Sequence, residues 1–217
     1  SRICKSEKIE VLISDNRFGC WSSSCISIFI THQIFIQAPL FQSFIRGLNF
    51  WCMKQYQQVW IPDVERAPGY SGSLSHGNNL PAHARYIGLL SRFSLDKREK
   101  QPEFHYKICV LLSGPEPQRT LLEGMLLKQL EQLEVRSLVV RGLPHSKQKL
   151  HLTSPIQIEN HLPAKELQAR LLASELVICR SGYSSIMDLA ALGKKALFIP
   201  TPGQTEQEYL AQLFKAE

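Results

Sequence analysis

The segment LVICRSGYSSIMDLAALGKKALFI, residues 176–199, carries the pattern of a strand, a turn, a helix and a second strand. Its first four residues are apolar, and its small-residue turn leads into Tyr183–Leu192, where apolar residues recur at helical spacing. Gly193 follows at the position where helices commonly end in a left-handed residue. Because two apolar strands joined through a helix are the unit of a covered parallel sheet, this segment predicts an α/β fold.

The same alternation extends to both sides of this segment. We expect further strands at Ile108–Leu112, Ser137–Val140 and Pro155–Glu159, and helices at Gln118–Leu133, from Pro163 at a first helical position to about Ala173, and at Thr205–Phe214. Residues 85–217 therefore predict a doubly wound domain. Ligands of such sheets lie beyond the carboxyl ends of the strands, where three loops stand: Ser113–Pro117, Arg180–Ser185 and Pro200–Gln204.

Residues 1–84 have a different texture. Val11–Ile13, Ile26–Ile30 and Val59–Ile61 read as strands, and residues 40–56 as an amphipathic helix. With only two or three strands, this part predicts a second α/β domain that is incomplete at its N-terminus. The stretch Pro62–Ala84 is rich in Gly, Ser, Asn and Pro and lacks periodicity, so we expect it to be the interdomain connection.

Composition restricts the class of protein. The 217 residues are 44% hydrophobic and 20% charged, which is ordinary for a globular protein, and the net charge of +6 suits anionic partners. No basic stripe interleaved with aromatic residues is present, so nucleic acid is not an expected partner. The six cysteines lack paired spacing, and we expect them to be reduced and the protein to be cytoplasmic. Residues 26–45 are too polar for a membrane span, which leaves contact with the inner membrane surface open.

The turn Arg180–Ser185 is the strongest candidate site. It opens a helix whose first backbone N–H groups and positive dipole end face the ligand edge, as a phosphate requires. Asp188, on the same helix, is suited to accept hydrogen bonds from two ribose hydroxyls. Alternatively, the turn is only a helix cap and Asp188 an exposed helix residue. The expected phosphate-binding residues are Arg180, Ser181, Gly182, Ser184 and Ser185.

These residues also carry a resemblance to a known family. The segments Arg180-Ser-Gly through Asp188, Leu192-Gly193, Phe198-Ile-Pro200 and Gln207-Glu-Tyr209 resemble the family 28 C-terminal domain, the donor-binding half of GT-B glycosyltransferases. The resemblance implies two Rossmann-type domains, ribose at Asp188, pyrophosphate at the turn, and donor sugar at Gln207 and Glu208. The family often has two amide residues at this last pair, so Glu208 is a departure that bears on the choice of sugar.

Residue chemistry qualifies some of these roles. Thr205 and Glu208 fit a capping box, which is an alternative for Glu208 that Gln207 lacks. Prolines at 115 and 117 remove N–H donors from the first loop. Arg92 matches a family arginine near the phosphates, with a surface arginine as the alternative. The donor-binding set that the resemblance implies is Arg92, Ser113, Gly114, Glu116, His161, Leu162, Arg180, Ser181, Gly182, Tyr183, Ser184, Ser185, Asp188, Gln204, Gln207 and Glu208.

On the acceptor side, Asp15, His32 and His76 are candidate proton acceptors, each with a polar turn or linker residue as its alternative. No Asp-x-Asp occurs, and Asp63-Val-Glu65 is a weak substitute in an irregular stretch. We therefore expect neither a metal nor a cofactor, and the helix N-terminus with Arg180 or Arg92 to stabilise the leaving diphosphate.

The resemblance implies a hexosyltransferase that moves N-acetylglucosamine from its uridine diphosphate form to an acceptor hydroxyl with inversion. Its partners would be the nucleotide sugar and a saccharide or lipid-linked acceptor, with Phe35–Trp51 as a membrane-facing segment. A nucleotide-sugar 2-epimerase of the same architecture and a donor-binding module without complete catalytic machinery are the alternatives. This chain alone is expected to bind donor but to be a poor catalyst.

Overall fold

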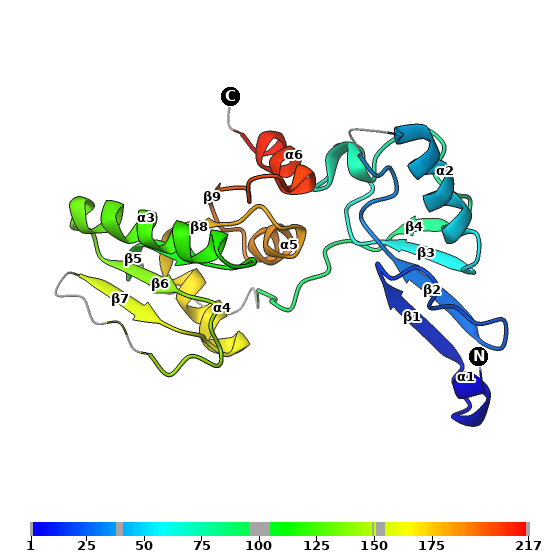
Figure 1. Ribbon diagram of the computed structural model, residues 1–217, viewed down its shortest axis with the longest axis horizontal. Coiled ribbons are helices and arrows are strands. Elements are labelled where there is room, and N and C mark those ends of the chain that lie inside the picture. The colour runs from blue at the N-terminus through cyan, green and yellow to red at the C-terminus, as the bar shows by residue number, and fades with distance from the viewer. Residues whose placement is uncertain (1, 38–40, 96–104, 149, 151–154, 216–217) are drawn as a thin grey trace. The chain divides into compact units, whose positions relative to one another are not determined.

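The computed structural model describes residues 2–37, 41–95, 105–148, 150 and 155–215. The chain divides into two compact units, Ser1–Leu90 and Ser91–Glu217, and each contains its own parallel sheet (Figure 1). This division falls after the boundary expected between residues 84 and 85. The reason is that β4 (Ala84–Tyr86) pairs in parallel with β3 (Gln58–Ile61) and so belongs to the first unit.

The first unit is built on four parallel strands in the order β1-β2-β3-β4, where the sequence suggested two or three. Its core joins β2 and β3 to the helix α2, through buried residues that include Phe29, Met53 and Ile61. The expected helix start at Leu40 lies outside the described residues. The remaining elements of this unit are α1 (Arg2–Ser6), β1 (Val11–Asp15), β2 (Ile26–Ile30), α2 (Gln42–Met53) and the 3₁₀ turn η1 (Gly72–Leu74).

The sequence suggested that the irregular stretch Pro62–Ala84 is an interdomain connection, and this prediction is wrong. It is the crossover between β3 and β4 of one sheet. The fully buried carboxylate of Asp63 organises it, accepting hydrogen bonds from the backbone N–H groups of Val64, Tyr70 and Ser71 and from the Ser71 hydroxyl. Because side-chain to backbone bonds, rather than an apolar stripe, hold this loop, hydrophobic periodicity could not reveal it.

The second unit is a doubly wound sheet with strand order β7-β6-β5-β8-β9, all parallel, as the sequence predicted. The chain builds outward from β5 through β6 to β7 and then returns to the other side of β5. The elements are β5 (Tyr106–Leu111), α3 (Gln118–Leu133), β6 (Ser137–Val140), β7 (Ile156–Glu159), α4 (Ala164–Leu172), β8 (Ser174–Cys179), α5 (Tyr183–Ala191), β9 (Ala196–Phe198) and α6 (Thr205–Leu213).

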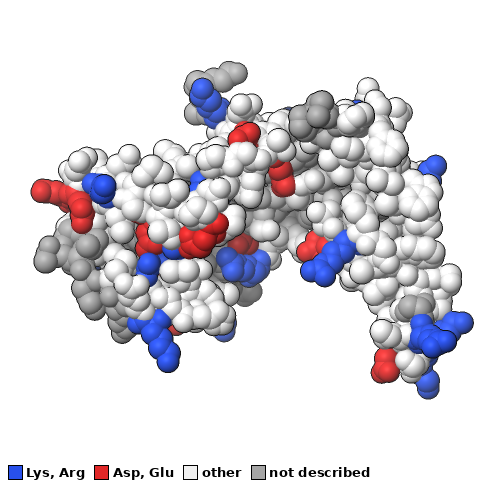
Figure 2. All heavy atoms as spheres, in the orientation of Figure 1, with Lys and Arg blue, Asp and Glu red and all other residues white. Residues whose placement is uncertain are grey.

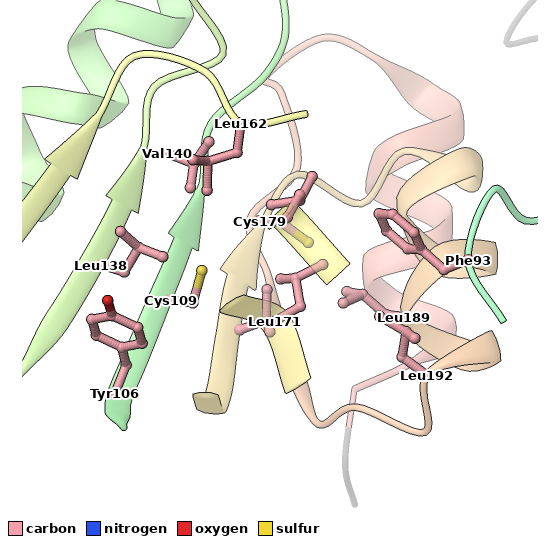
Figure 3. Close-up of a cluster of buried hydrophobic side chains, with 12 residues drawn as sticks. Phe93, Tyr106, Cys109, Leu138, Val140, Leu162, Leu171, Cys179, Leu189 and Leu192 are labelled. Atoms are coloured by element: carbon pink, nitrogen blue, oxygen red, sulfur yellow. The ribbon is translucent and has the colours of Figure 1, made fainter. Parts of the chain in front are cut away.

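Side-chain alternation along β5 divides the core of this unit into two layers. Val110 faces α3 and packs among Leu122 and Leu126, whereas Cys109 faces the opposite side of the sheet. There it packs in the cluster drawn in Figure 3, which α4 and α5 complete with residues such as Leu171 and Leu189. Covering helices on both faces explain why these strands are continuously apolar in sequence.

Candidate functional site

The reversal of strand order between β5 and β8 opens the carboxyl edge of the second sheet. In this fold class ligands bind at such a switch point. Three loops meet there, after β5, β8 and β9. Gly114 has a φ of 104°, which favours glycine, and a Cβ at this position would lie 3.9 Å from Thr201 Oγ1. The loops after β5 and β9 therefore lie side by side.

The N-terminus of α5 faces this edge in a form suited to an anion. Gly182 is the N-cap in extended conformation, no side chain caps it, and a Cβ there would meet nothing within 4 Å. Ser184 is exposed and Ser185 half-buried. Ser181, in contrast, is fully buried, and its hydroxyl donates to the Gln207 carbonyl at 2.7 Å. Ser181 thus joins the turn to α6 instead of presenting a donor to a ligand.

The Arg180 side chain is buried and hydrogen-bonded to the neighbouring loops, in contrast to the expectation that it contacts phosphate. Its side chain is 4% exposed, and its guanidinium donates to the carbonyls of Pro200 at 2.8 Å and Gln118 at 3.0 Å. Burial lowers the pKa of this guanidinium. Carbonyl partners do not neutralise its charge, so Arg180 contributes a positive field under the edge. Among the described residues, Arg180 Nε and Thr201 Oγ1 are buried atoms without a hydrogen-bond partner.

Asp188 and Arg92 come together, but they contact each other. The Asp188 carboxylate accepts a hydrogen bond from Ser91 Oγ at 2.7 Å and forms an ion pair with Arg92 Nε at 2.9 Å. Its side chain is 13% exposed, while that of Arg92 is 55% exposed and stacks on Phe93. A carboxylate has about four lone-pair sites, so the two bonds leave capacity for ribose hydroxyls. Asp188 also anchors the first residues of this unit to α5.

The two residues assigned to the donor sugar support the loop after β9. Gln207 Oε1 accepts from the Thr201 N–H at 2.9 Å, and its amide nitrogen donates to Gln204 Oε1 at 2.5 Å. Glu208 Oε1 accepts from the Gly203 N–H at 2.9 Å. The idea that Gln207 lacks a structural role is therefore wrong. The expected capping box is also wrong, because Gln204, and not Thr205, is the N-cap of α6.

The loop after β5 has a capping function. Glu116 accepts from the Thr120 N–H at 3.2 Å and from Arg119 Nε at 2.6 Å. Hydrogen bonding from the side chains of Thr120 and Arg119 holds the pKa of the Glu116 carboxyl below its usual range. These contacts agree with the alternative interpretation of this loop, in which it forms a rigid turn into α3. Ser113 is exposed beside it.

A buried charge network below this loop escaped the sequence reading. Glu123 on α3 pairs with Arg119 at 2.7 Å and with Arg141, which follows β6. Arg141 Nη1 also donates to Asn160 Oδ1 at 2.9 Å, so the network joins the loops after β6 and β7 to α3. The spacing of Arg119 and Glu123, four residues apart on α3, was the available signal.

The remaining donor candidates differ in exposure. His161 is exposed after β7, whereas Leu162 packs in the core among α4 and α5. The side chain of Leu162 is thus a core residue, and only its backbone stands near the edge. Tyr183 is likewise buried, at 7% exposure.

The three acceptor-side candidates lie in the first unit. Asp15 ends β1 and is exposed, and His32 lies just beyond the end of β2, the neighbouring strand. His76 follows η1 and stacks on Tyr86, with its ring nitrogens 3.0 Å from the Val64 carbonyl and 3.2 Å from the Gly72 carbonyl. Both nitrogens face acceptors, so His76 supports the crossover loop. Within the described residues, no group of three or more His, Cys, Asp or Glu side chains is arranged to hold a metal.

Comparison with known proteins covers part of this edge. Residues 127–217 match the Glycosyltransferase family 28 C-terminal domain. This range contains α5, α6 and the loops after β8 and β9. This part of the chain is therefore similar to the family 28 C-terminal domain.

Curated relatives of the family 28 domain match over a short segment. The UDP-N-acetylglucosamine--N-acetylmuramyl-(pentapeptide) pyrophosphoryl-undecaprenol N-acetylglucosamine transferase of Methylobacterium radiotolerans is 47% identical over 47 residues, 22% of this chain and 13% of that protein. The transferase of the same name from Rhodopseudomonas palustris strain HaA2 is 44% identical over 46 residues, 21% of this chain and 13% of that protein.

Solved structures show that the fold extends over both units. The glycotransferase of kitacinnamycin aligns with a TM-score of 0.61 and 12% identity, covering 96% of this chain and 62% of that one. Acinetobacter baumannii MurG aligns with a TM-score of 0.54 and 15% identity, covering 98% of this chain and 59% of that one. The chain thus has the GT-B glycosyltransferase fold and spans about three fifths of these neighbours.

Proposed function

We propose that this protein transfers a sugar, N-acetylglucosamine, from its uridine diphosphate form to an acceptor hydroxyl with inversion, as a cell-envelope glycosyltransferase. The observation that carries the proposal is the family 28 segment, whose loops stand with an uncapped helix N-terminus at the switch point of the second sheet. The names of the curated relatives support the choice of sugar donor.

In this proposal the donor diphosphate lies at the first turn of α5. Backbone N–H groups and the hydroxyls of Ser184 and Ser185 bind it, and the field of Arg180 acts from below. Asp188 accepts the ribose hydroxyls, while Arg92 is near enough to swing from Asp188 to a phosphate. Gln204 in the loop before α6 faces the sugar together with Gln207 and Glu208 in the first turn of α6, and the backbone after β7 faces the uracil.

The chemistry proposed is a direct displacement. A base removes the proton of the acceptor hydroxyl as that oxygen bonds to the anomeric carbon, and the bond to the diphosphate breaks. The helix dipole and the two arginines stabilise the negative charge that develops on the leaving diphosphate, so no metal is part of this mechanism. Asp15 and His32 are better candidates for the base than His76, because both His76 nitrogens face carbonyl acceptors.

We further propose that α2 brings the protein to the membrane that carries a lipid-linked acceptor. Four large apolar side chains, spaced three or four residues apart along this helix, are exposed, and Figure 2 shows few charged side chains over α2. They are Phe41, Phe44, Leu48 and Trp51, with exposures of 79%, 72%, 51% and 61%. No helix in the described part of the chain has the length and apolar character to span a bilayer. The fraction of protein that sediments with lipid vesicles should fall for Trp51→Ser. It should not fall for Gln55→Ser, which changes a half-buried polar residue.

Calorimetric titration of the chain with a panel of nucleotides tests the donor assignment. UDP and UDP-N-acetylglucosamine should bind more tightly than thymidine, adenosine or guanosine diphosphates, with affinity unchanged by a chelator. Affinity that disappears with the chelator and returns with magnesium would contradict the metal-free mechanism. Equal affinity for all diphosphates would contradict the uridine assignment. Product analysis with and without acceptor then separates transfer from 2-epimerisation.

A further inference from the structure

The second unit has a pocket at the amino edge of its sheet, opposite to the donor-site loops. It has a volume of about 520 Å³ and is formed where β5 and β8 begin and where the turn after α5 enters β9. Six-residue strands separate the two edges by roughly 20 Å, at about 3.3 Å per residue. The lining residues are Lys107, Ile108, Glu175, Leu176, Leu192, Gly193, Lys194 and Lys195.

The charges of this pocket favour an anion. Three ammonium groups and one carboxylate line it, which leaves a net charge of +2. Glu175 pairs with Lys107 at 2.5 Å, through side chains that are 39% and 60% exposed, and its charge also acts on Lys194, so the net charge of +2 belongs to the four groups together. A net charge of +2 matches a compact dianion better than a singly charged carboxylate.

Lys194 is held in place for such a role. Its ammonium donates to the carbonyl of Leu172 at 3.3 Å and to that of Ser174, which fixes the long side chain at the pocket. Carbonyls orient an ammonium without neutralising it, and burial lowers the pKa of Lys194.

The pocket wall also leaves room for a ligand. Gly193, with a φ of 59°, turns the chain between α5 and β9, and a Cβ there would meet nothing within 4 Å. Leu192 beside it is 2% exposed and belongs to the core cluster of Figure 3, so the wall is part of the packed core. We propose that this pocket binds a phosphate group, as free phosphate or a phosphate ester, at a site separate from the donor edge.

Amide chemical shifts provide the test, with inorganic phosphate as the probe at constant ionic strength. Saturable shifts are expected at Glu175 and at Gly193–Lys195, and they should persist when UDP occupies the donor site. Shifts confined to the turn Arg180–Ser185, or shifts that never saturate, would overturn the proposal. Because UDP binding is read from a different set of amides, a failure here leaves the proposed donor site unaffected. Acetate that binds as tightly as phosphate would overturn the assignment to phosphate.

Charge-changing variants sharpen this test. Lys194→Gln and Lys195→Gln should each lower the affinity for phosphate about fivefold. Glu175→Gln should raise this affinity about twofold, as expected for partly exposed charges. If Lys194→Gln perturbs the fold, Lys195→Gln still tests the proposal, because Lys195 is exposed. Lys165→Gln and Glu166→Gln make the same charge changes in the first turn of α4, and they should leave phosphate affinity unchanged. Equal effects of pocket and control variants would reduce the site to general electrostatic attraction.

Discussion

At the scale of single residues, the Asp188 carboxylate has a structural role and a proposed binding role. It anchors Ser91 and Arg92 to α5, and its remaining lone pairs are the ones assigned to ribose. Sequence alone could place Asp188 on the helix but not its partners, because Ser91 and Arg92 lie almost one hundred residues away in the chain. Arg180 was placed correctly after β8 and given the wrong orientation for the same reason.

Asp188→Asn should weaken UDP binding by at least about tenfold, since it replaces charged hydrogen bonds to the ribose with neutral ones. The structural role is separated by repeating the titration with 2′-deoxy-UDP. If Asp188 binds the ribose, the variant and the wild type should differ less for the deoxy nucleotide than for UDP. An equal loss for both nucleotides would mean that Asp188 acts only by anchoring Arg92.

At the scale of elements, periodicity predicted the second unit well. The bounds of α3 and β6 match the sequence reading, because amphipathic and fully buried patterns mark a covered parallel sheet. The crossover Pro62–Ala84 was misread because Asp63, and not an apolar stripe, organises it. The start of α6 at Thr205 was predicted correctly, but the capping box was not, since Gln204 is the N-cap and the Glu208 carboxylate accepts from the Gly203 N–H.

The connection between α3 and β6 depends on Glu123, which lies between Arg119 and Arg141. Glu123→Gln should lower the free energy of unfolding of the second unit by about 3–5 kcal/mol, because it removes the carboxylate that pairs with the buried Arg141 and leaves the buried Arg119 with only the exposed Glu116. Urea unfolding measures this change. Glu116→Gln is the matched control, since it removes a carboxylate from the same Arg119 at an exposed position, and its effect should be small. Equal effects would show that burial of the network contributes nothing.

At the scale of the whole molecule, the chain has two separate hydrophobic cores under two sheets. Chains of this kind commonly unfold in more than one step. Every residue of the proposed donor site belongs to the second unit, whereas the candidate bases and the apolar stripe of α2 belong to the first. Donor binding and acceptor binding are thus assigned to different cores, and ligands should stabilise the two cores unequally.

This assignment predicts that UDP raises only the unfolding transition of the second unit. Leu138 and Ile61 are fully buried aliphatic residues, one in each core, so Leu138→Ala and Ile61→Ala should each destabilise their own unit by about 2–5 kcal/mol. Calorimetry of the two variants therefore identifies which transition belongs to which unit. At a concentration one hundred times its dissociation constant, UDP should add about 2.7 kcal/mol to the transition that Leu138→Ala lowers. The transition that Ile61→Ala lowers should stay where it is, because a nucleotide that contacts only the second unit has no differential affinity for the folded first unit. An equal rise of both transitions would contradict the assignment of the donor to the second unit alone.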